Sequence, residues 1–141
     1  MKNNFDLSPP CTICYPRIKM KLGLDCPRKL SSYISVRTKY ADEEEYIGDT
    51  ETIIESTTPE FCRTLKLVYY CGIYDRQTVT FEVYDGDASG NGYLFCSIEL
   101  LVFDLIRLTI FPLQREHDFL GYLKIQCNLS LHTEVVSLVS V

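Results

Sequence analysis

The chain has 141 residues, a length that suits a single domain built on one hydrophobic core. Its hydrophobic content of 46% and charged content of 23% are ordinary for a globular protein and argue against disorder along the whole chain. The formal net charge of −5 argues against a general attraction to nucleic acid or to anionic lipid, because both would repel the protein. Binding to such a surface would need a local basic patch or a bound cation.

The chain contains seven cysteines, a large and odd number for its length. The N-terminus lacks the apolar run of a signal peptide, so we expect reduced thiols and a cytoplasmic protein. Cys11 and Cys14 have the spacing of zinc ligands, but no second such pair follows, and His117 and His132 are the only histidines that could supplement them. We interpret the two cysteines as loop residues, with a zinc or redox role as the alternative.

The hydrophobic pattern divides the chain into a tail and a run of strands. Residues 1–16 carry three prolines without periodicity and are predicted as an N-terminal tail, followed by a single domain over residues 17–141. Apolar and polar side chains then alternate with period two, as in strands that bury one face. The predicted strands cover residues 18–24, 32–40, 46–54, 61–71, 78–85 and 119–129, with a last one at 135–141. Short strands separated by turn signals predict an all-β fold, an antiparallel sandwich or barrel.

An acidic loop opens at the end of the strand 78–85, with the sequence Asp85-Gly86-Asp87. Carboxylates that lie this close repel each other unless they are solvated or neutralised. Ca²⁺ binds about six to eight oxygen ligands, and Asp-Gly-Asp lets two carboxylates project to the same side of the chain. The alternative is a solvated turn, because Asp and Gly are turn-forming residues.

Four segments in this order resemble a C2 domain: residues 48–53 (GDTETI), 58–61 (TPEF), 81–87 (FEVYDGD) and 117–121 (HDFLG). The stretch from residue 68 to residue 85 is most similar to the first C2 domain of copines. The resemblance covers about residues 17–92 and 115–138. It implies an antiparallel Greek-key sandwich of eight strands, whose loops at one end bind Ca²⁺ and then phospholipid.

The resemblance also implies the roles of individual residues. Asp85 and Asp87 would begin the third calcium-binding loop, Asp118 would end it, and Asp25 would be the ligand from the first loop. Calcium there would turn an anionic loop into a cationic bridge to anionic phospholipid headgroups. The resemblance therefore implies a cytoplasmic protein that associates peripherally with the plasma membrane. We expect no enzymatic activity, because no nucleophile is paired with a base.

The first predicted calcium loop departs from the C2 pattern. The segment 25–33 is short and holds one aspartate, while Arg28 and Lys29 stand where a calcium ligand would be expected. A partial oxygen cage predicts weak calcium binding or none. The alternative is a calcium-independent module of the same fold, in which Arg28 and Lys29 contact lipid phosphates directly or which binds a protein partner.

Residues 93–114 are nearly continuously apolar, and they are predicted as a helical or irregular insert within the third loop. A buried or amphipathic helix would place Leu101, Leu105 and Leu108 near helical spacing. The alternatives are a membrane-spanning helix, in which the charged residues would be costly, an interfacial segment, and an artefact of gene prediction. The chain stops at Val141, before the last strand that the family would contribute, so we also expect a truncated domain.

Overall fold

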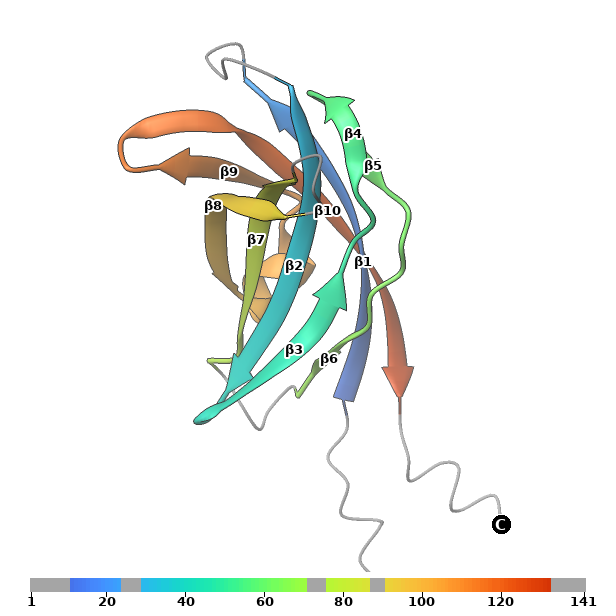
Figure 1. Cartoon of the computed structure of the whole chain (residues 1–141). Coiled ribbons are helices and arrows are strands. Elements are labelled where there is room, and N and C mark those ends of the chain that lie inside the picture. The colour runs from blue at the N-terminus through green and yellow to red at the C-terminus, as the bar shows by residue number, and fades with distance from the viewer. Residues whose placement is uncertain (1–10, 24–28, 71–75, 87–90, 133–141) are drawn as a thin grey trace, which may run out of the picture.

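Two antiparallel sheets packed face to face make up the computed structural model (Figure 1), which describes residues 11–23, 29–70, 76–86 and 91–132. Sheet A has the strand order β5-β1-β10-β9, with β6 also paired to β1, and sheet B has the order β3-β2-β7-β8, with β4 also paired to β2. The strands of sheet A are β1 (Cys11–Leu22), β5 (Glu60–Phe61), β6 (Leu67–Tyr69), β9 (Ile110–Arg115) and β10 (Asp118–His132). The strands of sheet B are β2 (Leu30–Tyr40), β3 (Glu43–Asp49), β4 (Ile53–Ser56), β7 (Thr78–Gly86) and β8 (Gly92–Leu101). The predicted all-β, antiparallel C2-type sandwich is confirmed.

The core lies between the two sheets and is filled by the side chains that the period-two alternation predicted to face inward. The fully or almost fully buried ones are Ile18, Met20, Ile34, Val36, Leu67, Val79, Phe81, Val83, Leu123 and Ile125. Each such side chain stabilises the fold by about 1.5–3 kcal/mol through removal of apolar surface from water. The alternation fails at Leu129, which is 53% exposed toward the end of β10.

Strand β1 begins earlier than predicted, because residues 11–16 belong to the strand and not to the tail. It pairs with β10 along its whole length, from Cys11 opposite His132 to Leu22 opposite Gly121. On its other side, β6 pairs with residues 12–14 and β5 with residues 18–19. Pro16 lies in the gap between these two short strands, where its missing N–H breaks no ladder hydrogen bond.

The apolar segment 93–114 is part of both sheets, which corrects its prediction as a helical or irregular insert in a loop. Its first part forms β8, which pairs along β7 from Gly92 to Leu101, and its last part belongs to β9, which pairs with β10. Between them lies the six-residue helix α1 (Val102–Arg107), the helical part of the segment. Among the described residues, no helix is long and apolar enough to cross a membrane.

The apolar character of this segment follows from its position in the sandwich. Val102 and Leu105 of α1 are buried in the core, as is Phe111 of β9. Pro112 is tolerated because β9 is an edge strand, which can lack one backbone donor. The segment is thus apolar because its strands and helix each contribute to the core.

The strand ends that flank the β1–β2, β4–β5, β7–β8 and β9–β10 connections lie together at one end of the sandwich, which is called the loop end below and lies at the top of Figure 1. The register places them there: Leu22, at the end of β1, lies opposite Gly121 near the start of β10, and Leu30, at the start of β2, lies opposite Ser56 at the end of β4. The amide of Leu22 also donates to the carbonyl of Thr57 in the β4–β5 turn (2.8 Å).

Candidate functional site

Asp85 ties the end of β7 to the start of β2 at the loop end. It stands near the end of β7, between Ser32 on β2 and Tyr93 on β8, and it is 6% exposed. Its Oδ1 accepts a hydrogen bond from the backbone amide of Ser31 (3.0 Å). A buried carboxylate needs such donors, because burial without them is costly. The start of β2 and the end of β7, which adjoin the predicted first and third calcium loops in the sequence, are therefore tied together.

Two stacked tyrosines support the same part of sheet B. The rings of Tyr33 and Tyr84 lie 5.1 Å apart with an interplanar angle of 9°. Gly92 lies against this stack, since a Cβ there would come within 2.6 Å of the Tyr33 hydroxyl oxygen. Glycine at this position thus lets the start of β8 approach the rings closely.

Asp118 lies on a different connection from Asp85. The connection that follows β7 ends where β8 begins at Gly92, so Asp118 does not close it, contrary to the prediction. Instead Asp118 is exposed at the β9–β10 turn in sheet A. In the strand register it lies opposite Arg115, and Glu116 and His117 form the turn between them. The prediction failed because residues 93–114 were taken as loop, whereas they form two strands.

The other predicted site residues are only partly described. Asp25, Asp87 and Arg28 lie outside the described residues, and Lys29 is exposed just before β2. Among the residues that the structure does describe, no three His, Cys, Asp or Glu side chains group so as to hold a metal ion. The calcium set and the lipid contacts of Arg28 and Lys29 stay predictions.

The cysteine pair predicted as loop residues belongs to β1. The thiol of Cys14 is buried in the core, and the side chain of Cys11 lies outside the described part of the chain. A hydrogen bond with Cys127 on β10, together with burial, raises the pKa of the Cys14 thiol well above its usual range. The complete burial of Cys14 in the apolar core favours a packing role.

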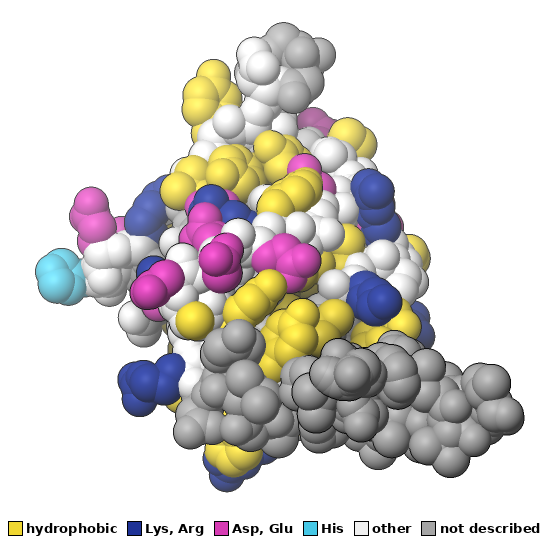
Figure 2. Space-filling model, turned by 90° about the horizontal axis from the view of Figure 1, so that it is seen from below, with side chains coloured by type: hydrophobic (Ala, Val, Ile, Leu, Met, Phe, Trp, Pro, Cys, Tyr) yellow, Lys and Arg dark blue, Asp and Glu magenta, His cyan; other side chains and the backbone are white. Residues whose placement is uncertain are grey.

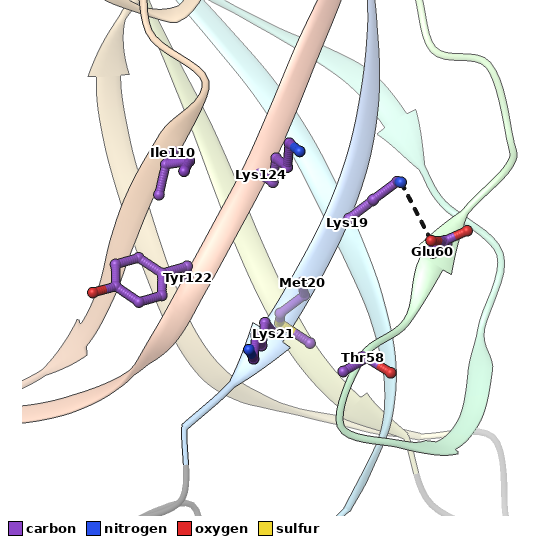
Figure 3. A pocket seen from close by; sticks show the side chains of 8 residues that line it. All are labelled: Lys19, Met20, Lys21, Thr58, Glu60, Ile110, Tyr122 and Lys124. Carbon is purple, nitrogen blue, oxygen red and sulfur yellow. Dashed lines mark ion pairs between the residues drawn. The ribbon is translucent and has the colours of Figure 1, made fainter.

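A groove that the sequence did not reveal crosses the outer face of sheet A (Figure 3), with a volume of about 460 Å³. It is called the lysine groove. The described residues that line it are Lys19, Met20, Lys21, Thr58, Glu60, Ile110, Tyr122 and Lys124. Figure 3 shows Ile110 and Tyr122 on one side, Thr58 and Glu60 on the other, and the three lysines between them.

Strand pairing brings the lysines of this groove together. Lys19 lies directly opposite Lys124, and Lys21 opposite Tyr122, in the β1–β10 register. The outward positions of Lys19 and Lys21 follow from the alternation in β1. Lys124 could not be added from the sequence, because nothing in it showed that β10 would pair with β1. Beyond Lys19 and Lys124, the same face continues to Arg17 and Gln126 in a smaller hollow.

Acidic side chains concentrate elsewhere. Residues 42–45, at the turn between β2 and β3, are exposed and include four consecutive carboxylates. This turn lies at the end opposite the loop end, and the view from below shows several acidic side chains close together (Figure 2). The net charge of −5 is therefore unevenly spread, and the outer face of sheet A is locally basic.

No family model matches the chain, and no curated protein is similar to it in sequence. Solved structures do match its fold. The BON1-C2B domain is 13% identical, with a TM-score of 0.62, over 92% of this chain and 99% of that one. A C2 domain of plant extended synaptotagmin 1 is 11% identical, with a TM-score of 0.55, over 88% of this chain and 98% of that one. This chain has the fold of a C2 domain.

A third match is to a longer chain. CC2D1B, which is described in connection with the mitotic reformation of the nuclear envelope, is 15% identical to this chain with a TM-score of 0.63. The match covers 97% of this chain but 61% of CC2D1B. Identities this low establish the C2 fold and leave function to the residues themselves.

Proposed function

We propose that this chain is a copine-like C2 module that binds anionic phospholipid membranes through its loop end, with the help of calcium. The observation that carries the proposal is the hydrogen bond between the Ser31 amide and the Asp85 carboxylate. It ties the start of β2 to the end of β7, and the connections that adjoin these strand ends contain Asp25 and Asp87 in the sequence. Asp25, Asp85 and Asp87 are therefore the calcium ligands of the proposal, and Asp118 is not needed.

Exposed apolar side chains at the loop end support contact with a bilayer. Phe119 and Tyr122, near the start of β10, are 39% and 45% exposed, and their rings meet edge to face at 4.9 Å. Tyr93 and Leu94 on β8 and Ile54 on β4 are more exposed still. Aromatic and aliphatic side chains in such positions gain free energy by entering the membrane interface.

Calcium would supply positive charge between the aspartates and the lipid phosphates. The described residues supply only part of a calcium site, because Asp85 is the one buried carboxylate among them at the loop end. In the proposal, the module carries no enzymatic activity of its own and is recruited from the cytoplasm to the plasma membrane as a peripheral protein.

Vesicle co-sedimentation tests the calcium role. We expect the protein to pellet with phosphatidylserine vesicles in calcium and to stay in solution with chelator. The double variant Asp85→Asn/Asp87→Asn should lose this difference, whereas Asp104→Asn on the helix α1, as the matched control, should keep it. Equal pelleting of the unmodified protein in calcium and in chelator would contradict the calcium role.

A calcium-independent module is the second candidate, and one observation favours it. Oδ1 of Asp85 already accepts a hydrogen bond from the Ser31 amide. Direct contact of Arg28 and Lys29 with lipid phosphates, or a protein partner, would then replace calcium. A ligand that binds only the folded state raises its melting temperature, so an unchanged melting temperature in millimolar calcium would select this candidate.

A further inference from the structure

We propose that Tyr46 is a phosphorylation site for a protein tyrosine kinase that selects acidic segments. In this step the phenol oxygen of Tyr46 forms a bond to the γ-phosphorus of ATP, the bond from that phosphorus to the β–γ bridging oxygen breaks, and ADP leaves. The phenol proton passes to the catalytic base of the kinase. Tyr46 lies on β3, which takes no part in the proposed calcium site or membrane contact, so this inference is independent of the proposed function.

The tyrosine directly follows an acidic run. Residues 42–45 read DEEE, Tyr46 comes next, and Ile47 follows it. The side chains of residues 42–46 are all exposed, so their charges reach solvent at the end of the molecule seen in Figure 2. Charge patterns of this kind decide which segments a kinase accepts, because a basic substrate groove attracts and orients an acidic segment. The run therefore favours recognition of Tyr46 by a kinase with such a groove.

The fold presents Tyr46 in an accessible, extended conformation. Residues 41–42 form the tight turn of the β2–β3 hairpin, which lies at the bottom of Figure 1, and β3 continues from it as an extended strand. Within the described part of the chain, β3 pairs with β2 and is the edge of sheet B. An edge strand is open to another molecule along its free side. The side chain of Tyr46 is 60% exposed there.

Exposure alone does not distinguish Tyr46 from the other tyrosines. Tyr93 is 66% exposed and lies on β8, the other edge of sheet B. The five residues before it read ASGNG and carry no charge. Tyr33 and Tyr84, by contrast, are stacked on each other. The chain thus holds two exposed edge-strand tyrosines that differ in the charge before them, and the proposal selects the one with the acidic run.

Arginines beside Tyr46 can receive the phosphate. Arg37 lies directly opposite Tyr46 in the β2–β3 register. A hydrogen bond with the carboxylate of Asp49 raises the pKa of Tyr46, and the charge of Arg63 acts in the opposite direction. A phosphate on Tyr46 would carry about −1.5 to −2 charges, and guanidinium groups are well suited to bind it through two hydrogen bonds. Arg37 and Arg63 would therefore offset the repulsion from Asp49 and Glu44.

The experiment treats the whole folded chain with magnesium, ATP and the recombinant catalytic domain of a tyrosine kinase that prefers acidic residues before its target. Peptide mass spectrometry locates the phosphate and follows its rate of transfer. We expect Tyr46 to be modified at least about tenfold faster than Tyr93. Tyr46→Phe should remove most of the phosphate incorporated by the chain. Equal rates at Tyr46 and Tyr93 would overturn the proposal.

A matched pair of variants separates the acidic run from the net charge of the protein. Glu44→Gln/Glu45→Gln keeps Tyr46 but should lower kcat/KM for its phosphorylation by about tenfold. Glu99→Gln/Glu116→Gln removes the same charge from exposed positions elsewhere and should be phosphorylated as fast as the unmodified chain. Equal losses in the two variants would show that the run is not recognised. Melting temperatures establish that both variants are folded before they are compared.

The last comparison asks whether the fold itself presents the tyrosine. A synthetic peptide of residues 40–52 contains the acidic run and Tyr46 without the rest of the sandwich. We expect the folded chain to be phosphorylated at Tyr46 at a rate comparable with that of the peptide. If the kinase modifies the peptide but leaves Tyr46 of the folded chain unmodified, the edge strand does not present the tyrosine and the proposal falls. None of these outcomes alters the vesicle test of the proposed calcium role.

Discussion

Positively charged side chains on the outer faces of the two sheets differ in how completely they are paired with carboxylates. On sheet B, Arg37 of β2 reaches Glu82 of β7 at 2.7 Å and Glu44 of β3 at 3.8 Å, so its charge is matched by its neighbours. On sheet A, Lys19 pairs with Glu60, whereas Lys124, which lies opposite Lys19, has no carboxylate within ion-pair distance among the described residues. A matched cation fits a stabilising role, whereas two lysines in opposed positions cost stability through their repulsion.

The largest expected effect comes from breaking the strand register that places these lysines opposite each other. Gly121 has a φ of 146°, and a Cβ there would lie 2.2 Å from the backbone oxygen of Lys21. Gly121→Ala should therefore destabilise the protein by about 3 kcal/mol, through strain and a backbone clash at the end of the β1–β10 ladder. Chemical denaturation measures the loss. Gly23→Ala is the control, because its Cβ would make only ordinary contacts, and an equal loss there would contradict the explanation.

A smaller effect is expected where the two sheets are tied together near β5. The carboxylate of Glu51 accepts hydrogen bonds from the amides of Cys62 (2.7 Å) and Arg63 (3.1 Å). Although partial burial acts to raise it, these hydrogen bonds hold the pKa of Glu51 below its usual value of 4.5. Glu51→Gln should cost about 1 kcal/mol at neutral pH, allowing for the partial exposure of the carboxylate.

The pH dependence of this contribution has a definite sign. A carboxyl group whose pKa is lowered by folding stabilises the protein above its unfolded pKa, and the contribution is lost as the pH falls through the folded pKa. The stability difference between the native chain and Glu51→Gln should therefore be full at pH 7 and shrink below about pH 4.5. Urea titrations at both ends of this range measure it, and a difference that grows on acidification would contradict the assignment.

The sequence predicted strands where side chains alternate, and failed where pairing decides the structure. Ile18, Val36 and Phe81 were placed in the core correctly, because period two alone determines which face they occupy. Residues 93–114 were not recognised as strands, since a segment that contributes to the core from edge strands and a helix loses its clear alternation. That one error placed Asp118 in the wrong connection.

The candidate sites show the same division. Asp85 was singled out from its local motif, and the structure places it near the end of β7, where it accepts a hydrogen bond from the start of β2, while its role as a calcium ligand stays a prediction. The lysine groove depends on the pairing of Lys19 with Lys124, residues more than a hundred positions apart in the chain. No local pattern carries that information, because the register of distant strands is set by the packing of the whole sandwich.

The smallest expected change in stability distinguishes the two sheets most clearly, because removing one charged partner should stabilise sheet A and destabilise sheet B. Lys124→Glu would replace a like-charge pair with an attractive cross-strand pair between the new carboxylate and Lys19, and should stabilise the protein by about 0.2–0.5 kcal/mol. On sheet B, Glu82→Gln removes the closest partner of Arg37 and should destabilise by a similar amount. Thermal unfolding measures both. A stabilising Lys124→Glu would show that the opposed lysines repel each other; if Lys124→Glu lowered stability instead, the lysines of sheet A would be structural.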